Sequence, residues 1–177
     1  MRIALVAHDS RKKELVEWVT YNMEELKKHE LFATGTTGKL IKNIYVERIR
    51  DIDYVQRDKR DRDDYYGTYS IPRQRSYPFA EHVTCLHSGP LGGDQEIGAM
   101  IAKGELDVLI FFCDNLLVQG HQNDVSALTR LASLYNIAFA TNRTTADMIL
   151  TSPLFDNKDY KKVIPDCIAS YVNRQIN

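Results

Sequence analysis

LHSGPLGGDQEIG, residues Leu86–Gly98, joins a short apolar run to a helix-like one. Its three glycines before Asp94, together with Pro90, exclude a regular helix or strand in that part. The apolar, β-branched run Val83–Leu86 predicts the end of a strand, and the residues from Asp94 onward predict a helix. Asp94 is therefore expected at the mouth of a helix, reached from a strand through a glycine-rich turn.

Two interpretations of Asp94 follow from this position. Aspartate is a favoured N-cap, so its carboxylate would accept a hydrogen bond from the first turn of the helix. Alternatively, Asp94 is a catalytic carboxylate on a loop whose glycines let a substrate approach the backbone. Taken alone, the stretch favours the cap, and the choice depends on what the rest of the chain brings to the same place.

The composition is that of one ordinary globular domain. The chain has 177 residues, of which 44% are hydrophobic and 27% charged, and a net charge of −1. That charge gives no overall field favouring nucleic acid or a membrane surface. No apolar run approaches the ~20 residues that a membrane span needs, and the apolar run at the start is too short for a signal peptide. We expect a cytoplasmic protein.

The cysteines do not indicate a disulfide framework or a metal site. There are three of them (Cys85, Cys113 and Cys167), widely spaced and without a CxxC pair. Cys85 and Cys113 lie in apolar, strand-like runs, which predicts buried thiols.

Strand-like and helix-like segments alternate along the chain. Besides Val83–Leu86, the predicted strands are Arg2–Ala7, Leu31–Thr34, Leu106–Phe112, Ile137–Ala140 and Val163–Ile164. The predicted helices are Arg11–Lys28, a helix starting near Lys39, Asp94–Lys103, Asp124–Tyr135, Thr144–Thr151 and Asp166–Gln175. This alternation predicts an α/β fold: a three-layer, Rossmann-like open sheet, mainly parallel, of about five strands with helices on both faces.

One segment, about Ile44–His87, departs from the alternation. It contains eight consecutive charged residues at Arg57–Asp64 and six of the ten tyrosines. Its eight basic and eight acidic residues balance, so it is not a basic arm. We interpret it as a charged, tyrosine-rich insertion, at about residues 44–85, within a single domain of residues 1–177. It is either a solvated surface loop or a contact surface for a subunit or partner.

Polar and glycine residues follow each predicted strand of the regular pattern. In an open α/β sheet the carboxyl ends of the strands meet at one edge, where ligands bind. The residues expected there are His8 and Asp9, then Gly35–Gly38, Ser88–Asp94, Asp114 to Asp124 including His121, and Thr141–Arg143. A set of independent helix caps would not need these histidines and carboxylates. Their gathering at one edge therefore favours the catalytic interpretation of Asp94.

The residues at this edge suit a phosphate. Thr34–Gly38 supplies free backbone N–H groups, threonine hydroxyls and a helix N-terminus, although it matches neither a Walker motif nor GxGxxG. Lys12, one turn into the first helix, reaches the same edge. His8 and His121 are candidate general acids or bases, because the histidine side chain changes its charge near neutral pH. With Asp9 and Asp124 they would also be a ligand set, but no HxH or HxxxH spacing supports a metal, and we expect none.

Five motifs in order resemble the methylglyoxal synthase family. They are VAHD (Val6–Asp9), ATGTTG (Ala33–Gly38), SGPLGGDQ (Ser88–Gln95), LDVLIFF (Leu106–Phe112) and DV-x4-R (Asp124–Arg130). The resemblance covers nearly the whole chain except the insertion. It implies a carbon–oxygen lyase that converts dihydroxyacetone phosphate to methylglyoxal and inorganic phosphate, the methylglyoxal bypass of glycolysis, without cofactor or metal. It also implies a homohexamer and phosphate as an inhibitor.

The resemblance assigns a role to each matching position. Asp94 matches the catalytic base, and the other catalytic positions are His8, Asp9, His121 and Asp124. The substrate and phosphate positions are His8, Lys12, Thr34, Thr36, Thr37, Gly38, Ser88, Gly89 and His121. Arg130 and Arg174 match arginines near a subunit interface or phosphate.

The loop after the fourth strand departs from the family pattern. The family reads FFWDP and then PHDPD, whereas this chain reads FFCDN (Phe111–Asn115) and GHQND (Gly120–Asp124). Both prolines are lost and Cys113 replaces tryptophan, which gives the loop more conformational freedom.

The alternative function is a non-catalytic regulatory module of the same fold that senses a phosphorylated metabolite.

Overall fold

The centre of the molecule is a five-stranded sheet in the order β3-β2-β1-β4-β5. The structure, a computed structural model, describes residues 1–43, 82–116 and 122–174. Every pair of neighbouring strands runs parallel. The strands are β1 (Arg2–Ala7), β2 (Glu30–Ala33), β3 (Val83–Cys85), β4 (Val108–Phe112) and β5 (Ala138–Ala140). The predicted Rossmann-like α/β class is confirmed, with a described sheet that is wholly rather than mainly parallel.

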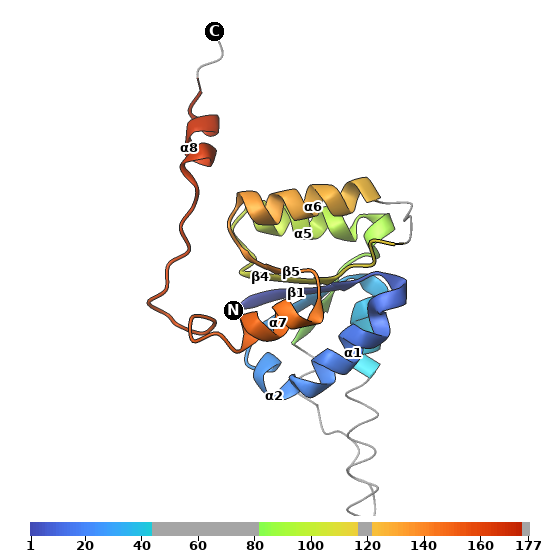
Figure 1. The fold of residues 1–177 in the computed structure, drawn as a ribbon. Helices are drawn as coiled ribbons and strands as arrows, with labels where there is room; N and C mark the ends of the chain where they lie inside the picture. Colours follow the sequence, from blue (N-terminus) through green and yellow to red (C-terminus); the bar gives the residue numbers. More distant parts are fainter. Residues whose placement is uncertain (44–81, 117–121, 175–177) are drawn as a thin grey trace, which may run out of the picture.

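Helices cover both faces of this sheet (Figure 1). α5 and α6 lie side by side on one face, and α1, α7 and the helical residues 35–43 cover the other. The helices with printed bounds are η1 (Asp9–Arg11), α1 (Lys12–Tyr21), α2 (Met23–Leu26), η2 (Gly89–Leu91), α5 (Gly93–Ala102), α6 (Gln122–Leu134), α7 (Arg143–Leu150) and α8 (Asp166–Val172). Parallel strands require such crossovers, because a tight hairpin cannot join them.

The core consists of two apolar layers separated by β1. Along a strand, successive side chains point to opposite faces. Leu5 accordingly packs in the layer with Trp18 of α1, and Val6 in the layer with Ile97 of α5. The Trp18 indole N–H donates to Asp147 Oδ1 on α7 at 2.7 Å, which satisfies the polar atom of this buried ring.

Two sequence predictions of regular structure need correction. The helix predicted at Arg11–Lys28 is divided, because Asn22 leaves helical geometry between α1 and α2 and its side-chain Nδ2 donates to the Trp18 carbonyl at 3.0 Å. The strand predicted at Val163–Ile164 is wrong. Both side chains are exposed and the residues have no regular secondary structure, because they reach no strand with which to pair.

The cysteine prediction is also partly wrong. Cys85 is exposed, because β3 is an edge strand of the described sheet and pairs only with β2 there. Cys113 is half-buried, and burial raises the pKa of its thiol from an ordinary 9.0 to about 11.

The predicted insertion lies outside the described residues over 44–81, whereas Val83–Cys85 belongs to the sheet. Of the helices in the described ranges, none is both long and apolar enough to cross a membrane.

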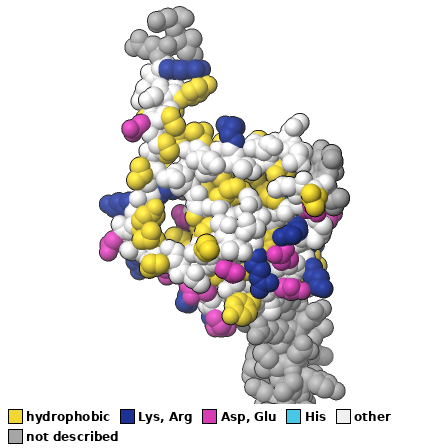
Figure 2. Space-filling view, viewed as in Figure 1, with side chains coloured by type: hydrophobic (Ala, Val, Ile, Leu, Met, Phe, Trp, Pro, Cys, Tyr) yellow, Lys and Arg dark blue, Asp and Glu magenta, His cyan; other side chains and the backbone are white. Residues whose placement is uncertain are grey.

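The C-terminal part of the chain leaves the sheet and its helices. Phe155 still packs in the core, and the residues after it lead to α8, which stands apart from the other elements (Figure 1). No residue of α8 is buried, and Tyr171 and Val172 are 65% and 74% exposed. Hydrophobic side chains therefore lie along this exposed arm (Figure 2).

Candidate active site

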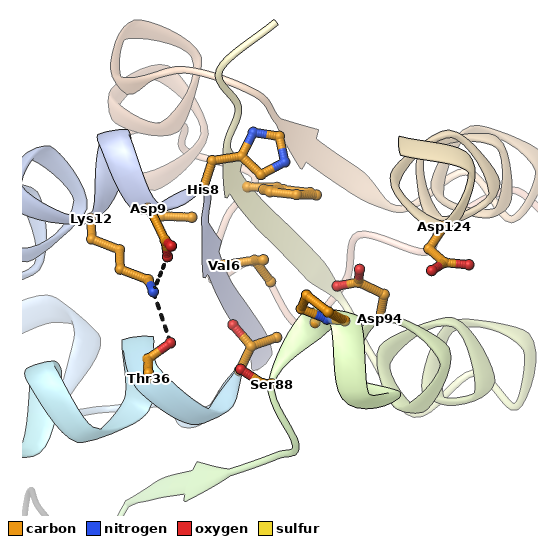
Figure 3. A pocket seen from close by; sticks show the side chains of 13 residues that line it. Val6, His8, Asp9, Lys12, Thr36, Ser88, Asp94 and Asp124 are labelled. Carbon is orange, nitrogen blue, oxygen red and sulfur yellow. Dashed lines mark hydrogen bonds and ion pairs between the residues drawn. The ribbon is translucent and has the colours of Figure 1, made fainter. Parts of the chain in front are cut away.

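A cavity of about 530 Å³ opens at the carboxyl edge of the sheet, where the sequence predicted a ligand site. It collects side chains that follow β1, β2 and β3 and one from the start of α6 (Figure 3). Its lining residues are Val6, Ala7, His8, Asp9, Lys12, Thr34, Thr36, Ser88, Gly89, Pro90, Asp94, Phe111 and Asp124.

His8 is held in place directly after β1. Its backbone N–H donates to the Phe112 carbonyl at 3.2 Å, and its buried ring meets Phe111 edge-on with 5.0 Å between centroids. The backbone N–H of Asp114 donates to His8 Nδ1 at 2.8 Å. Since Nδ1 is an acceptor, the neutral ring carries its proton on Nε2.

Lys12 connects the ends of β1 and β2. Its ammonium pairs with Asp9 at the start of η1 and donates to Thr36 Oγ1 at 2.8 Å (Figure 3). The Lys12 side chain is only 18% exposed, so its charge faces the cavity wall rather than bulk water. An ammonium group has three N–H donors, which leaves one for an anion in the cavity.

The turn after β3 is compact and depends on its glycines. The Ser88 carbonyl accepts from Leu91 N at 2.9 Å and from Gly93 N at 3.0 Å. Gly92 has a φ of +106°, a conformation that side chains rarely adopt. Gly92, and not Asp94, is the N-cap of α5, and Asp94 lies in the first turn of that helix. The structure thus does not use Asp94 as the cap that the local sequence favoured.

The carboxylate of Asp94 lies at the bottom of the cavity. Asp94 is 3% exposed, and a Cβ on Gly89 would lie 3.1 Å from its Oδ1, so a side chain at position 89 would crowd the carboxylate. Asp124 reaches the cavity from the first turn of α6. Both carboxylates stand at helix N-termini, where the helix dipole favours negative charge.

The cavity accordingly has two different ends (Figure 3). The Lys12 ammonium and the Thr36 hydroxyl are at one end, Asp94 and Asp124 are at the other, and His8 and Ser88 lie between them. This is an arrangement for a small substrate with an anionic group at one end and a reacting carbon at the other.

Some predicted residues lie elsewhere. Thr37 and Gly38 are buried behind the cavity rather than in its lining, and the Thr34 hydroxyl donates to Thr37 Oγ1 at 3.4 Å. Arg130 is exposed on α6, and Arg174 follows α8 with its guanidinium 4.0 Å from the centroid of the Tyr171 ring. His121 lies outside the described residues.

The sequence assigned no site role to Pro90, Phe111 or Asp114. Pro90 and Phe111 line the cavity, while Asp114 orients His8 and accepts from Ser10 Oγ at 2.5 Å. Asp114 directly follows an apolar strand, and this position could have identified it as a site residue. In the ranges that the structure describes, no three His, Cys, Asp or Glu side chains gather closely enough to hold a metal ion.

The parallel sheet and the polar cavity at its carboxyl edge are those of an MGS-like domain. The family model described as MGS-like domain matches residues 66–141. A methylglyoxal synthase of Maridesulfovibrio salexigens is 42% identical over 174 residues, which cover 98% of this chain and 96% of that protein. The methylglyoxal synthase of Coxiella burnetii (strain RSA 493 / Nine Mile phase I) is 43% identical, over 99% of this chain and 97% of its own length. The chain belongs to the methylglyoxal synthase family, a family of enzymes.

A solved structure agrees with this assignment. The crystal structure of methylglyoxal synthase from Elizabethkingia anophelis NUHP1 superposes with a TM-score of 0.74 and 38% sequence identity. The match covers 99% of this chain and 92% of that one. The resemblance inferred from the five motifs is thereby confirmed.

Proposed function

We propose that this chain converts dihydroxyacetone phosphate to methylglyoxal and inorganic phosphate, with Asp94 as the base. The observation that carries the proposal is the polarity of the cavity: a buried carboxylate at one end and the Lys12 ammonium with the Thr36 hydroxyl at the other. The substrate has the same polarity, since its phosphate and its hydroxymethyl group are at opposite ends of three carbons.

The first step is a proton transfer. Asp94 removes a proton from the hydroxymethyl carbon. The electron pair of that C–H bond forms a C–C double bond, and the π electrons of the carbonyl move onto its oxygen to give an enediolate. A carboxylate is a weak base for such a carbon acid, so the oxygen must be stabilised as its charge develops. We assign His8, with its proton on Nε2, to donate to that oxygen.

The second step expels the phosphate. The hydroxymethyl oxygen passes its proton to the former carbonyl oxygen, and its electron pair forms an aldehyde. The C–C double bond then shifts towards the third carbon as the bond from that carbon to the phosphate oxygen breaks, with Lys12, Thr36 and Ser88 holding the departing group. The resulting enol takes a proton on its terminal carbon and becomes methylglyoxal. Elimination requires the breaking C–O bond to lie out of the enediolate plane, whereas a bond held in that plane leads to reprotonation and isomerisation.

The remaining predicted roles extend this scheme. We assign His121, assisted by Asp124, to moving protons between the two enediol oxygens, and Asp9 to holding the Lys12 ammonium. Thr34, Thr37, Gly38 and Gly89 shape the phosphate side. The scheme uses no cofactor and no metal.

The decisive experiment measures methylglyoxal release from dihydroxyacetone phosphate by the purified chain and by Asp94→Asn. We expect turnover to fall by at least about a thousandfold in the variant, because the base is lost, while phosphate binding stays within about threefold. Asp159→Asn, an exposed aspartate in the stretch after α7, is the control and should keep full turnover. A parent chain that binds phosphate but releases no methylglyoxal would instead indicate the regulatory module.

Product inhibition follows from the same site. Inorganic phosphate is the group that Lys12 and the threonines hold, so we propose that it competes with the substrate. It should raise the apparent KM and leave kcat unchanged. A decrease in kcat without a change in KM would show that phosphate acts elsewhere.

We further propose a homo-oligomer, a hexamer by family resemblance, that works in the cytoplasm. The support is α8, which buries none of its own residues and exposes Tyr171 and Val172. Arg130 and Arg174, which lie away from the cavity of their own chain, are proposed as interface or phosphate contacts between subunits. Light scattering of the purified chain gives the mass that tests this.

A further inference from the structure

One residue, His87, connects the two ends of the cavity through its backbone N–H and C=O groups. It lies directly before Ser88, where the chain leaves β3. Its carbonyl accepts from the backbone N–H of Gly35 at 3.0 Å, and Gly35 begins the helical residues 35–43 on the phosphate side. The same carbonyl oxygen would lie 2.1 Å from a Cβ on Gly93, the first residue of α5.

Glu96 holds the backbone N–H of the same residue, His87. Its Oε2 accepts the backbone N–H of His87 at 2.9 Å, and its Oε1 lies 2.6 Å from His87 Nδ1. Glu96 is two residues after Asp94 in α5, so the carboxylate that holds His87 comes from the helix that carries the base. The backbone and side-chain hydrogen bonds from His87 lower the pKa of Glu96, so the carboxylate remains ionised at neutral pH.

We infer that the His87–Glu96 pair is a positioning device for the reaction: it fixes the phosphate side of the cavity relative to the Asp94 carboxylate. The inference rests on the proposed function. The Gly35 N–H holds the His87 carbonyl from one side, and Glu96 holds its N–H from the other. Ser88, the next residue, is thereby fixed between Thr36 and Asp94 (Figure 3).

The contribution of this pair to stability is small. The side chain of His87 is 71% exposed and that of Glu96 is 37% exposed, and exposed pairs of this kind add little to folding. The pair acts on the position of the base relative to the substrate. A misplacement of about 1 Å between a reacting carbon and its base lowers the rate up to about a hundredfold. Binding of the phosphate group alone does not depend on where Asp94 lies.

The test compares Glu96→Ala with Glu96→Gln in the full chain. Glu96→Ala removes both contacts, so kcat should fall about 10- to 100-fold. The KM for dihydroxyacetone phosphate and the Kd for inorganic phosphate should stay within about threefold. A substrate deuterated at the hydroxymethyl carbon should show a larger kinetic isotope effect, because proton removal becomes slower. Glu96→Gln keeps a carbonyl acceptor for the His87 N–H and should retain at least about a third of kcat.

The control is Glu105→Ala, beyond the other end of α5, which should leave kcat, KM and the isotope effect unchanged. A Glu96→Ala enzyme with parent kcat and isotope effect would overturn the inference. Equal losses in Glu96→Ala and Glu96→Gln would also overturn it, because they would assign the effect to charge rather than to the hydrogen bonds.

Hydrogen exchange separates this inference from the proposed function, because it needs no turnover. Glu96→Ala should speed exchange of the Gly35 and Gly93 amides, which bond to the carbonyls of His87 and Ser88, and Glu105→Ala should not. Faster exchange in Glu96→Ala, together with a parent chain that releases no methylglyoxal, would refute the proposed function but still show that the pair holds the turn in place. Unchanged exchange would refute the positioning role even in an active enzyme.

Discussion

At the scale of single residues, Gly93 has the least room for a side chain among the glycines in the described ranges. A Cβ there would lie 2.1 Å from the His87 carbonyl oxygen, a distance that requires the backbone to move. We expect Gly93→Ala to lower the free energy of unfolding by at least about 2 kcal/mol and to displace Asp94. Urea unfolding measures the first effect and turnover the second.

Gly98→Ala is the matched control on the same helix. Its Cβ would meet only the Cδ1 atom at the end of the Leu131 side chain, at 3.1 Å, which can rotate away. Alanine also favours the helix by up to about 1 kcal/mol over glycine. Stability within about 1 kcal/mol of the parent is expected, and an equal loss in both variants would contradict the steric argument.

Cys113 gives a second prediction at this scale. Burial raises the pKa of its thiol from 9.0 to about 11, which lowers the thiolate fraction at neutral pH by about a hundredfold. We expect iodoacetamide at pH 8 to modify Cys113 far more slowly than the same cysteine in the urea-unfolded chain. Mass spectrometry of the peptides at timed intervals measures both rates, and equal rates would refute the prediction.

The residues of the candidate site differ in how far the sequence could place them. Polar residues after apolar strands located His8, Ser88 and Asp94, because parallel strands carry their carboxyl ends to one edge. Whether Asp94 caps its helix depends on where the helix starts. The turn at Gly92 starts α5 two residues earlier than a cap at Asp94 would require. Arg130 and Arg174 came only from family resemblance, since no pattern within one chain reports on contacts with another.

At the scale of elements, the strands themselves were easier to predict than the strands with which each one pairs. Runs such as Leu106–Phe112 are apolar throughout, which is typical of a strand covered on both faces. An apolar run does not indicate which other strands it pairs with. The sequence therefore did not predict the edge position of β3 or the exposure of Cys85. Val163–Ile164 has the composition of a strand but reaches no partner, and composition alone cannot distinguish the two cases.

His29, between α2 and β2, makes the stability of the fold depend on pH. It is buried, its ring meets Phe155 edge-on at 5.2 Å, and its Nδ1 lies 3.2 Å from the N-terminal amine. Burial, and next the charge of that amine, lower its pKa below the ordinary 6.5. The unfolded chain therefore binds a proton at a higher pH than the folded chain does, and stability falls as pH drops below about 6.5.

The measurement compares urea unfolding at pH 7.5 and pH 5.5. We expect the parent to lose stability on acidification, and His29→Gln to lose less, because it has no ring to protonate in the unfolded state. His82→Gln replaces an exposed histidine and should keep the parent difference. A His29→Gln chain with the same pH dependence as the parent would show that another group is responsible.

At the scale of the whole molecule, the exposed C-terminal arm gives the clearest prediction. None of the residues of α8 is buried, so its removal leaves the core of the subunit intact. A chain ending at Ile164 should keep its far-ultraviolet circular dichroism per residue almost unchanged and lose the oligomer seen by light scattering. The cut spares Val163, whose carbonyl accepts from Asn136 Nδ2 at 2.9 Å. A truncated chain with the parent mass would place the subunit contacts elsewhere.

The position of β1 at the centre of the sheet has a consequence for synthesis on the ribosome. β1 is the first strand to emerge, but one of its two neighbours, β4, ends at Phe112. At roughly 5–20 residues per second, that partner follows β1 after roughly 5–20 s. During this interval a strongly apolar edge is open to pairing with other nascent chains. The need for chaperones should therefore be greatest before the second half of the chain is made.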